Sequence, residues 1–253
     1  MRCILKGLFI GSILQASSSA FAFHNYDKAS SKQYQTGNNN VIMGGMEDND
    51  QSSGGWDDYA DDWDNQPGVR EFSQNTKNVL MKQDIPESWS QATILDLGCG
   101  TGILSRMIAG ECKSIVSIDP SGKMVDVLKK HIENNEALQN ILPVKGILDD
   151  ATAGEFLEKK LGPFDAVVAN SVCSFVPDYD ALLLNIHKLL KPGGYFVQAD
   201  FRQTKEPLTE NQGDGFHEAF MRKAYTKAEL TVITIEPMTV TENNIIVGVS
   251  KKE

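Results

Sequence analysis

From residue 93 to residue 200, short apolar runs alternate with longer stretches in which apolar positions recur along one helical face. The short runs have the length and composition of buried strands, and the longer stretches have the spacing of amphipathic helices. Strands are expected over residues 94–97, 114–118, 142–147, 164–170 and 195–199, and helices over residues 103–109, 121–134, 153–160 and 179–190. Strands joined by helices of this length predict a parallel sheet with right-handed crossovers.

The pattern changes on either side of this region. A further helix is expected over residues 69–82, ahead of the first strand. Near the C-terminus, residues 231–240 and 245–250 have the pattern of two strands separated by a short Asn-containing loop, which predicts an antiparallel hairpin at the edge of the sheet. The expected fold class is therefore α/β, with a mostly parallel seven-stranded sheet and a C-terminal antiparallel hairpin.

The start of the chain does not follow this pattern. Residues 1–22 combine a basic start, a short apolar run and small residues before a candidate cleavage point, which predicts a secretory signal peptide and not a spanning helix. Residues 23–55 lack hydrophobic periodicity and are expected to be a transit peptide or a disordered linker. A single folded domain is expected over residues 56–253.

The junction Ala20-Phe21-Ala22-Phe23 resembles the bipartite plastid presequences of diatoms and related algae, in which Phe directly follows the signal cleavage site. The resemblance implies import into a plastid, and secretion or delivery to an endomembrane lumen is the alternative. Beyond the presequence, Cys99, Cys112 and Cys173 are odd in number and have no paired spacing, so neither a disulfide framework nor a zinc site is expected. A reducing compartment suits these thiols, and we expect no bound metal.

The chain is acidic, with 34 Asp and Glu against 24 Lys and Arg and a formal net charge of −10. Nucleic acids and anionic membranes are recognised by clustered Lys and Arg. The charge therefore argues against a nucleic-acid partner and against stable membrane association, and it favours a small molecule.

The candidate chemistry begins where the first predicted strand runs into Gly98-Cys99-Gly100-Thr101-Gly102. Alternating glycines let a ligand approach the backbone and supply backbone angles that other residues adopt only at a cost. Position 103 is Ile, so the spacing differs from the G-x-G-x-x-G that suits a dinucleotide pyrophosphate, and it favours S-adenosylmethionine (SAM) over NAD. Asp119, about twenty residues further on at the end of the next strand, is placed to accept both ribose hydroxyls of an adenosine ligand.

Three stretches, Asp96 to Gly102, Ser117 to Ser121 and Leu189 to Gly194, together resemble class I SAM-dependent methyltransferases. The resemblance covers roughly residues 56–250, and its motifs are specific for the cofactor and not for the substrate. It implies a Rossmann-like three-layer sandwich, with SAM as cofactor. It also implies methyl transfer by in-line displacement, and the acidic charge of the chain favours a small molecule as the acceptor.

The resemblance also assigns roles to single residues around the cofactor. Asp96 would help to hold the methionine ammonium, Gly98, Cys99, Gly100 and Gly102 would form the turn beneath the ligand, and Asp119 would bind the ribose. Asp149 would bind the adenine amino group, with Ile147 against the ring, and Asn170 would lie beside the methionine part. Tyr59 and Trp63 are candidates for a lid over the cofactor, with aromatic packing of a first helix against the core as the alternative.

The acceptor side has weaker signals. His217 lies in a Gly-containing insertion between the fifth and sixth strands, where related folds cover the acceptor pocket, and it is a candidate general base. The alternative is a solvated insertion residue. Phe216 and Tyr225 are candidate walls of the same pocket, whereas Cys99 and Cys173 are expected to be packing residues without a redox or nucleophilic role.

Two other functions remain open at this point. A catalytically silent SAM-binding regulatory module would carry the same cofactor motifs, because the acceptor pocket leaves little trace in sequence. An NAD-dependent oxidoreductase is disfavoured by Ile103 and by the terminal hairpin.

Overall fold

The computed structural model describes residues 55–85, 88–240 and 243–253, and all of them belong to one compact unit. The expected signal peptide, residues 1–22, and all but the last residue of the expected transit or linker segment, residues 23–55, lie outside the described residues. Within the described residues, no helix is both long enough and apolar enough to cross a membrane.

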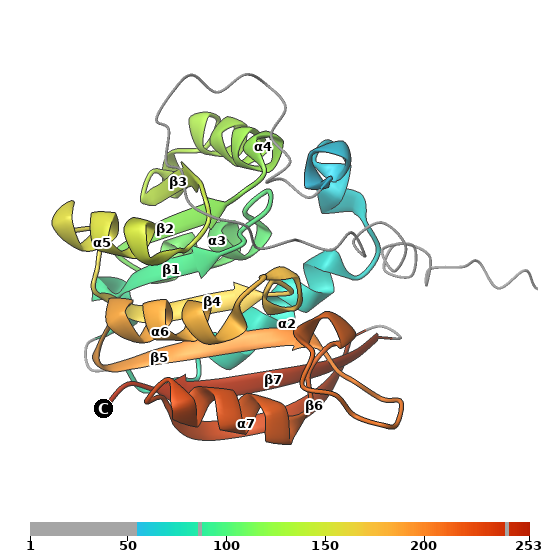
Figure 1. Ribbon diagram of the computed structural model, residues 1–253. Coiled ribbons are helices and arrows are strands. Elements are labelled where there is room, and N and C mark those ends of the chain that lie inside the picture. The colour runs from blue at the N-terminus through green and yellow to red at the C-terminus, as the bar shows by residue number, and fades with distance from the viewer. Residues whose placement is uncertain (1–54, 86–87, 241–242) are drawn as a thin grey trace, which may run out of the picture. The chain divides into compact units, whose positions relative to one another are not determined.

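A seven-stranded sheet forms the centre of the domain, in the order β3-β2-β1-β4-β5-β7-β6 (Figure 1). Its strands are β1 (Thr93–Leu97), β2 (Ser114–Asp119), β3 (Ile141–Lys145), β4 (Phe164–Asn170), β5 (Leu190–Phe201), β6 (Thr231–Val240) and β7 (Asn243–Lys251). The first five pair in parallel, and β7 runs antiparallel to both β5 and β6. The predicted parallel sheet with an antiparallel C-terminal pair is therefore confirmed.

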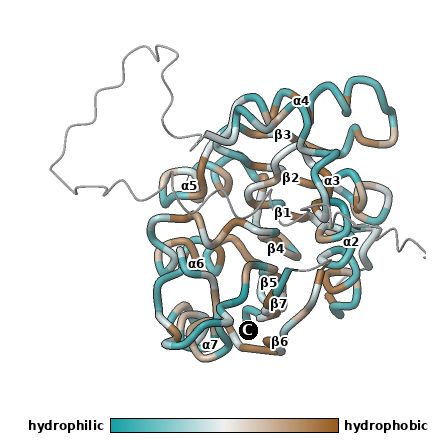
Figure 2. Tube along the Cα trace, turned by 90° about the vertical axis from the view of Figure 1, so that its right-hand side faces the viewer, coloured by the Kyte–Doolittle hydropathy of each residue, from teal (hydrophilic) through white to brown (hydrophobic). Residues whose placement is uncertain are grey.

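Helices cover both faces of the sheet, which Figure 2 shows edge on. They are α2 (Val69–Leu80), α3 (Ile103–Ile108), α4 (Gly122–Glu133), α5 (Asp150–Glu158), α6 (Tyr179–Leu189) and α7 (Glu218–Lys227). Helices α2, α3 and α4 lie on one face, and α5, α6 and α7 lie on the other (Figures 1 and 2). Because the central strands are buried on both faces, they are mostly apolar, as parallel strands usually are, and Asp96 in β1 and Asp165 in β4 are buried exceptions. The Rossmann-like three-layer sandwich is confirmed.

Two boundaries differ from the expectation by three residues or more, for local physical reasons. Helix α5 begins at Asp150, ahead of the expected residue 153, because the Asp149 side chain caps it by accepting from the Thr152 N–H at 2.8 Å. Strand β5 begins at Leu190, well before the expected residue 195. Leu190 already pairs with Phe164, and the following residues bulge out before the pairing resumes between Tyr195 and Ala166.

The core below α7 depends on a glycine in the last strand. A Cβ built on Gly248 would lie 2.5 Å from the Tyr225 hydroxyl oxygen, so only glycine leaves room for that ring against the sheet. Tyr225 is fully buried, and its hydroxyl donates to the Gln198 side-chain oxygen at 2.9 Å. Phe216 is fully buried as well and stacks on Phe220. The structure thus places Phe216 and Tyr225 in the core and not on the wall of an acceptor pocket.

Candidate functional site

The glycine turn lies at the carboxyl end of β1, where ligands bind in open α/β sheets. Gly98, Gly100 and Gly102 all have positive φ angles, of 62°, 55° and 78°. A Cβ on Gly98 would overlap Val172, and one on Gly102 would overlap Leu128. A Cβ on Gly100 would meet nothing closer than the Trp63 ring nitrogen, at 3.5 Å. The outer two glycines are therefore required by packing, whereas Gly100 leaves no side chain between the turn and the Trp63 ring that covers it.

Asp119 ties the glycine turn to the end of β2. Its carboxylate accepts from the Gly100 N–H at 2.8 Å through one oxygen and from the Ser121 N–H at 2.8 Å through the other. Burial raises the pKa of Asp119, and the two N–H bonds oppose that rise. The sequence spacing correctly predicted a carboxylate beside the turn, and the ribose contact itself stays a prediction.

Asp96 is buried beneath the turn. The Ser105 hydroxyl lies 2.5 Å from one carboxylate oxygen of Asp96 and 2.7 Å from the Ser117 hydroxyl. Burial, which outweighs the Ser105 hydrogen bond, raises the pKa of Asp96 to about 7. A cation bound next to this side chain would favour its ionised form, which suits the predicted role near a methionine ammonium.

Two other predicted cofactor residues make structural contacts. Asp149 is exposed and caps α5, and the Thr152 N–H bond lowers its pKa. The Asn170 side chain faces α2, because its oxygen accepts from the Thr76 hydroxyl at 2.5 Å and its nitrogen donates to the Ser73 hydroxyl at 3.3 Å. Their contacts with adenine and methionine stay predictions. The pairing of Asn170 with α2 gave no signal in the sequence.

Residues 55–68, called the strap below, cover the glycine turn. The strap contains two short 3-10 helices, Trp56–Tyr59 and Trp63–Asn65. The Trp56 ring packs edge-on against Trp63, with centroids 5.6 Å apart, and against Phe175 beyond β4, at 5.3 Å. Tyr59 lies 6.2 Å from Trp56 and is 45% exposed. Trp63 therefore rests on the turn, and Tyr59 lies at the outer edge of the aromatic group.

Two aspartates fasten the strap to the turn and to α4. The Asp64 carboxylate accepts from the Thr101 hydroxyl and the Arg106 guanidinium, each at 2.5 Å. The Asp57 carboxylate accepts from the Ser121 hydroxyl at 2.5 Å. The aromatic side chains of this segment were recognised from the sequence as a possible lid. The roles of Asp57 and Asp64 were missed, although the repeated aromatic-acidic pattern around them was the available signal.

The carboxyl end of β5 holds a carboxylate that the sequence did not single out. Asp200 is fully buried and accepts from both the hydroxyl and the N–H of Ser174, at 2.5 and 3.3 Å. Burial, against these hydrogen bonds, raises the pKa of Asp200 to about 6. Because Ser174 precedes Phe175, on which Trp56 packs, Asp200 fixes the surface that receives the strap.

His217, the candidate base, caps α7. Its Nδ1 accepts from the Phe220 N–H at 3.3 Å, and its ring lies 6.0 Å from the Phe220 ring. The capping bond occupies the lone pair of Nδ1, so in the neutral ring the proton resides on Nε2. The observed contact is therefore structural, and the general-base role stays a prediction.

The thiols and the possible metal ligands are separated from one another. Among residues 55–85, 88–240 and 243–253, no group of three or more His, Cys, Asp or Glu is placed to hold a metal ion. Cys99, Cys112 and Cys173 are free and are 9%, 8% and 0% exposed. Burial raises the pKa of the Cys112 thiol to about 12 and that of Cys99 and Cys173 well above the ordinary value. Packing is the role that this burial supports.

Comparison with known sequences gives a family match over the same region. Residues 95–196 match the methyltransferase domain family. A ubiquinone biosynthesis O-methyltransferase of Caulobacter vibrioides is 34% identical over 116 residues, which cover 46% of this chain and 43% of that protein. An arsenite methyltransferase of Aquipseudomonas alcaligenes is 32% identical over 124 residues, which cover 45% and 35%. The chain thus spans less than half the length of these curated relatives.

Solved structures share the fold. A SAM-dependent methyltransferase from Aquifex aeolicus superposes with a TM-score of 0.58 at 15% identity, over 77% of this chain and 97% of that chain. A Burkholderia thailandensis 1,6-didemethyltoxoflavin-N1-methyltransferase, solved with bound 1,6-didemethyltoxoflavin and S-adenosylhomocysteine, gives a TM-score of 0.58 at 18% identity, over 79% of this chain and 84% of that chain. The chain therefore carries the sequence pattern of the methyltransferase domain family over residues 95–196, on the fold that class I SAM-dependent methyltransferases share.

Proposed function

We propose that this domain is a SAM-dependent methyltransferase that methylates a small-molecule acceptor. The observation that carries the proposal is the hydrogen bond from the Gly100 N–H to the Asp119 carboxylate. It brings the Asp119 carboxylate beside the glycine turn at the carboxyl end of β1, where open α/β sheets bind their ligands, and this supports a ribose-binding role for Asp119. The family match covers both of these residues.

The residues present fit the cofactor. Gly100 puts no side chain between the turn and the Trp63 ring, and Asp119 supplies a buried carboxylate beside the turn. Asp96 lies below with a pKa of about 7, raised by burial. Such a carboxylate ionises more readily when a ligand cation approaches. When bound, SAM supplies an electrophilic methyl group and a neutral leaving group.

What remains for the protein is to align the acceptor and to exclude water. Alignment alone lowers barriers by several kcal/mol. The strap excludes water from the site, because Trp63 lies over the turn and Trp56 packs against Phe175. Asp200 and Ser174 hold that closing surface in place. The acceptor lies against the strap and the segment after β4. Methyl transfer to an acceptor aligned in this way does not require a general base.

Titration calorimetry of the full chain with S-adenosylhomocysteine tests the cofactor part of the proposal. We expect one saturable site. Turnover is then measured as S-adenosylhomocysteine formation from labelled SAM against an acceptor panel that contains phenols, amines, thiols and arsenite. Failure to bind S-adenosylhomocysteine refutes the proposal. Binding without turnover on any acceptor supports the SAM-binding regulatory module instead.

We also propose that the enzyme works inside a plastid, delivered by residues 1 to about 45. The signal-like start and the Ala20-Phe21 junction support this location, as do three buried thiols that remain unpaired. A fluorescent fusion of the full chain should accumulate in diatom plastids. The Phe21→Ala variant should stop outside the inner envelopes, and a wild-type fusion that appears in the medium would favour secretion.

A further inference from the structure

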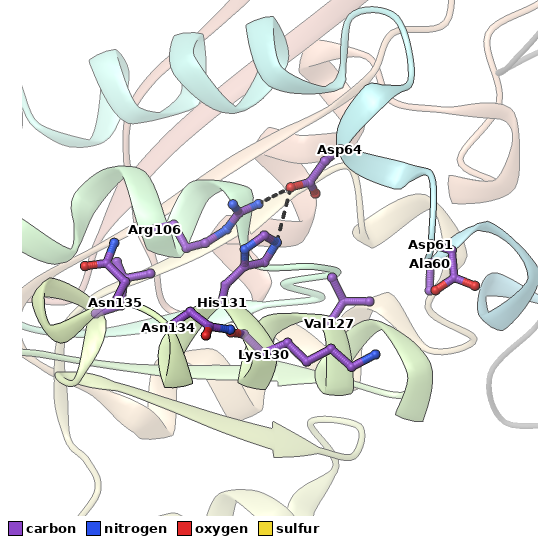
Figure 3. Close-up of a pocket in the computed structure, with 10 residues that line it drawn as sticks. Ala60, Asp61, Asp64, Arg106, Val127, Lys130, His131, Asn134 and Asn135 are labelled. Carbon is purple, nitrogen blue, oxygen red and sulfur yellow. Dashed lines mark hydrogen bonds and ion pairs between the residues drawn. The ribbon is translucent and has the colours of Figure 1, made fainter.

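Asp64 attaches the strap to both the glycine turn and α3. One oxygen of its carboxylate accepts from the Thr101 hydroxyl, and the other accepts from the Arg106 guanidinium at 2.5 Å (Figure 3). The Arg106 Nε also donates to the carbonyl oxygen of Gly102 at 3.2 Å. Arg106 therefore contacts the strap through one nitrogen and the glycine turn through another, while its backbone belongs to α3.

Arg106 supplies the positive charge that faces Asp64 at neutral pH. The His131 Nε2 lies 3.5 Å from the same carboxylate oxygen, but burial lowers the pKa of His131, so its ring is mostly neutral near pH 7. The Lys130 ammonium points away from this pair, toward the side of Asp61 (Figure 3). The Arg106 and Asp64 side chains are 18% and 28% exposed, so water screens their attraction less than that of a surface pair.

The strap itself buries few side chains. Among residues 55–68, only Ala60 is buried, and neither of the two 3-10 helices contains a buried residue. The strap joins α2 at Gly68, which has a positive φ angle of 81°. Glycine adopts many backbone angles at little cost, so the chain can turn at this position. Because segments with few buried contacts open at a small free-energy cost, the contacts of Asp64 matter for keeping the strap on the turn.

We propose that Arg106 is a positioning residue of the cofactor site: through Asp64 it holds the strap closed and thereby sets the rate at which a bound cofactor leaves. Trp63 lies over the turn at Gly100, so the strap has to move aside for a ligand of the turn to be released. When it moves, the Asp64 contact with Arg106 breaks, because Arg106 remains with α3 and the turn. The role in cofactor release rests on the proposed function.

Hydrogen exchange of the full chain without any ligand tests whether the pair holds the strap. Backbone amides of residues 55–68 should exchange about ten-fold faster in Asp64→Asn and in Arg106→Gln, because each variant loses a charge-assisted hydrogen bond, while amides of β1 and β4 should be unchanged. Asp62→Asn is the matched control, since Asp62 lies in the strap and accepts only from the Asn65 and Gln66 side chains. Equal exchange in the wild type and Asp64→Asn, or equal increases in both Asn variants, overturns the proposal.

The release rate is measured with labelled S-adenosylhomocysteine, which is bound to the full chain and then chased with an excess of unlabelled compound. We expect release to be about ten-fold faster in Asp64→Asn and in Arg106→Gln, and unchanged in Asp62→Asn. The double variant should release no faster than either single variant, because both substitutions break the same contact. Arg106→Lys keeps the charge and should restore part of the wild-type rate.

Three results would count against this role for Arg106. Release at the wild-type rate in Asp64→Asn and Arg106→Gln overturns it, and so does slower release from either variant. Additive effects in the double variant would show that the two side chains act separately, as general supports of the fold. If the wild type does not bind S-adenosylhomocysteine at all, the proposed function fails and the role in release fails with it, whereas hydrogen exchange still decides whether Arg106 and Asp64 hold the strap.

Discussion

Replacing Gly100 by alanine separates the ligand surface of the glycine turn from its packing. At φ 55°, an alanine side chain costs about 1–2 kcal/mol of folding free energy. The new methyl group would meet Trp63 and Met124 only at ordinary contact distances of 3.5 to 3.9 Å, so no overlap is added to that cost. Gly100→Ala should therefore lower the melting temperature by about 2–8 °C.

The same substitution should be far more harmful to cofactor binding. The added methyl group would lie between the turn and the Trp63 ring of the strap, where the ligand must reach the backbone. We expect the affinity for S-adenosylhomocysteine to fall about ten-fold or more, which corresponds to about 1.4 kcal/mol. Titration calorimetry measures the affinity, and differential scanning calorimetry measures the stability.

Two other glycines supply the controls. Gly102→Ala combines a similar backbone cost with overlap on Leu128, and it should destabilise the fold by about 2–5 kcal/mol. Gly110→Ala lies in open space and should change neither quantity. A folded Gly100→Ala protein that binds S-adenosylhomocysteine as tightly as the wild type would show that the turn is not the cofactor site.

Three further substitutions test single side chains. Asp119→Ala should weaken S-adenosylhomocysteine binding by about 1.5–3 kcal/mol in calorimetry, and an unchanged affinity would show that the ribose is held elsewhere. Asp96 has a folded-state pKa of about 7 against an ordinary 3.8, so its contribution to the free energy of unfolding is fully present below about pH 4 and is lost as the pH rises through 7. Urea unfolding at several pH values should show this loss of stability, and the Asp96→Asn variant should lose less stability over the same pH range. If the wild type and Asp96→Asn have the same dependence of stability on pH, the raised pKa is contradicted. His217→Ala should cost about 1 kcal/mol through the lost cap, with S-adenosylhomocysteine affinity preserved; a fall in turnover of about 10²-fold or more would instead identify His217 as the base.

The sequence was sufficient to predict the fold because the spacing of apolar residues that marks each helix and strand is a local property of the chain. Apolar runs followed by amphipathic stretches determine the parallel strands, and the two C-terminal strands lie close enough to be recognised as a hairpin. The start of β5 was missed because it depends on a partner elsewhere: Leu190 pairs with Phe164, and the ion pair between Lys191 and Asp165 holds the bulge that follows. Such a bulge leaves no periodic trace in the sequence.

The candidate site was predictable where it depends on a backbone turn and on the distance along the chain from one strand end to the next. The glycine turn and Asp119 were located correctly because a strand end fixes both. The strap contacts were not predictable, because Asp64 meets Thr101 and Arg106 across 37 and 42 residues of chain. The Thr76 contact with Asn170 spans 94 residues. Partner choice at such distances is decided by tertiary packing.

The burial of Cys99, Cys112 and Cys173 makes the folded domain easy to label at a chosen position. Since none of these thiols is more than 9% exposed, a maleimide dye will react slowly with them while the domain stays folded. A cysteine placed at Tyr59, which is 45% exposed on the strap, would be the accessible thiol among the described residues. A fluorophore attached there, in a protein produced without Cys3, would report opening of the strap in real time. Cys99, Cys112 and Cys173 would not have to be replaced.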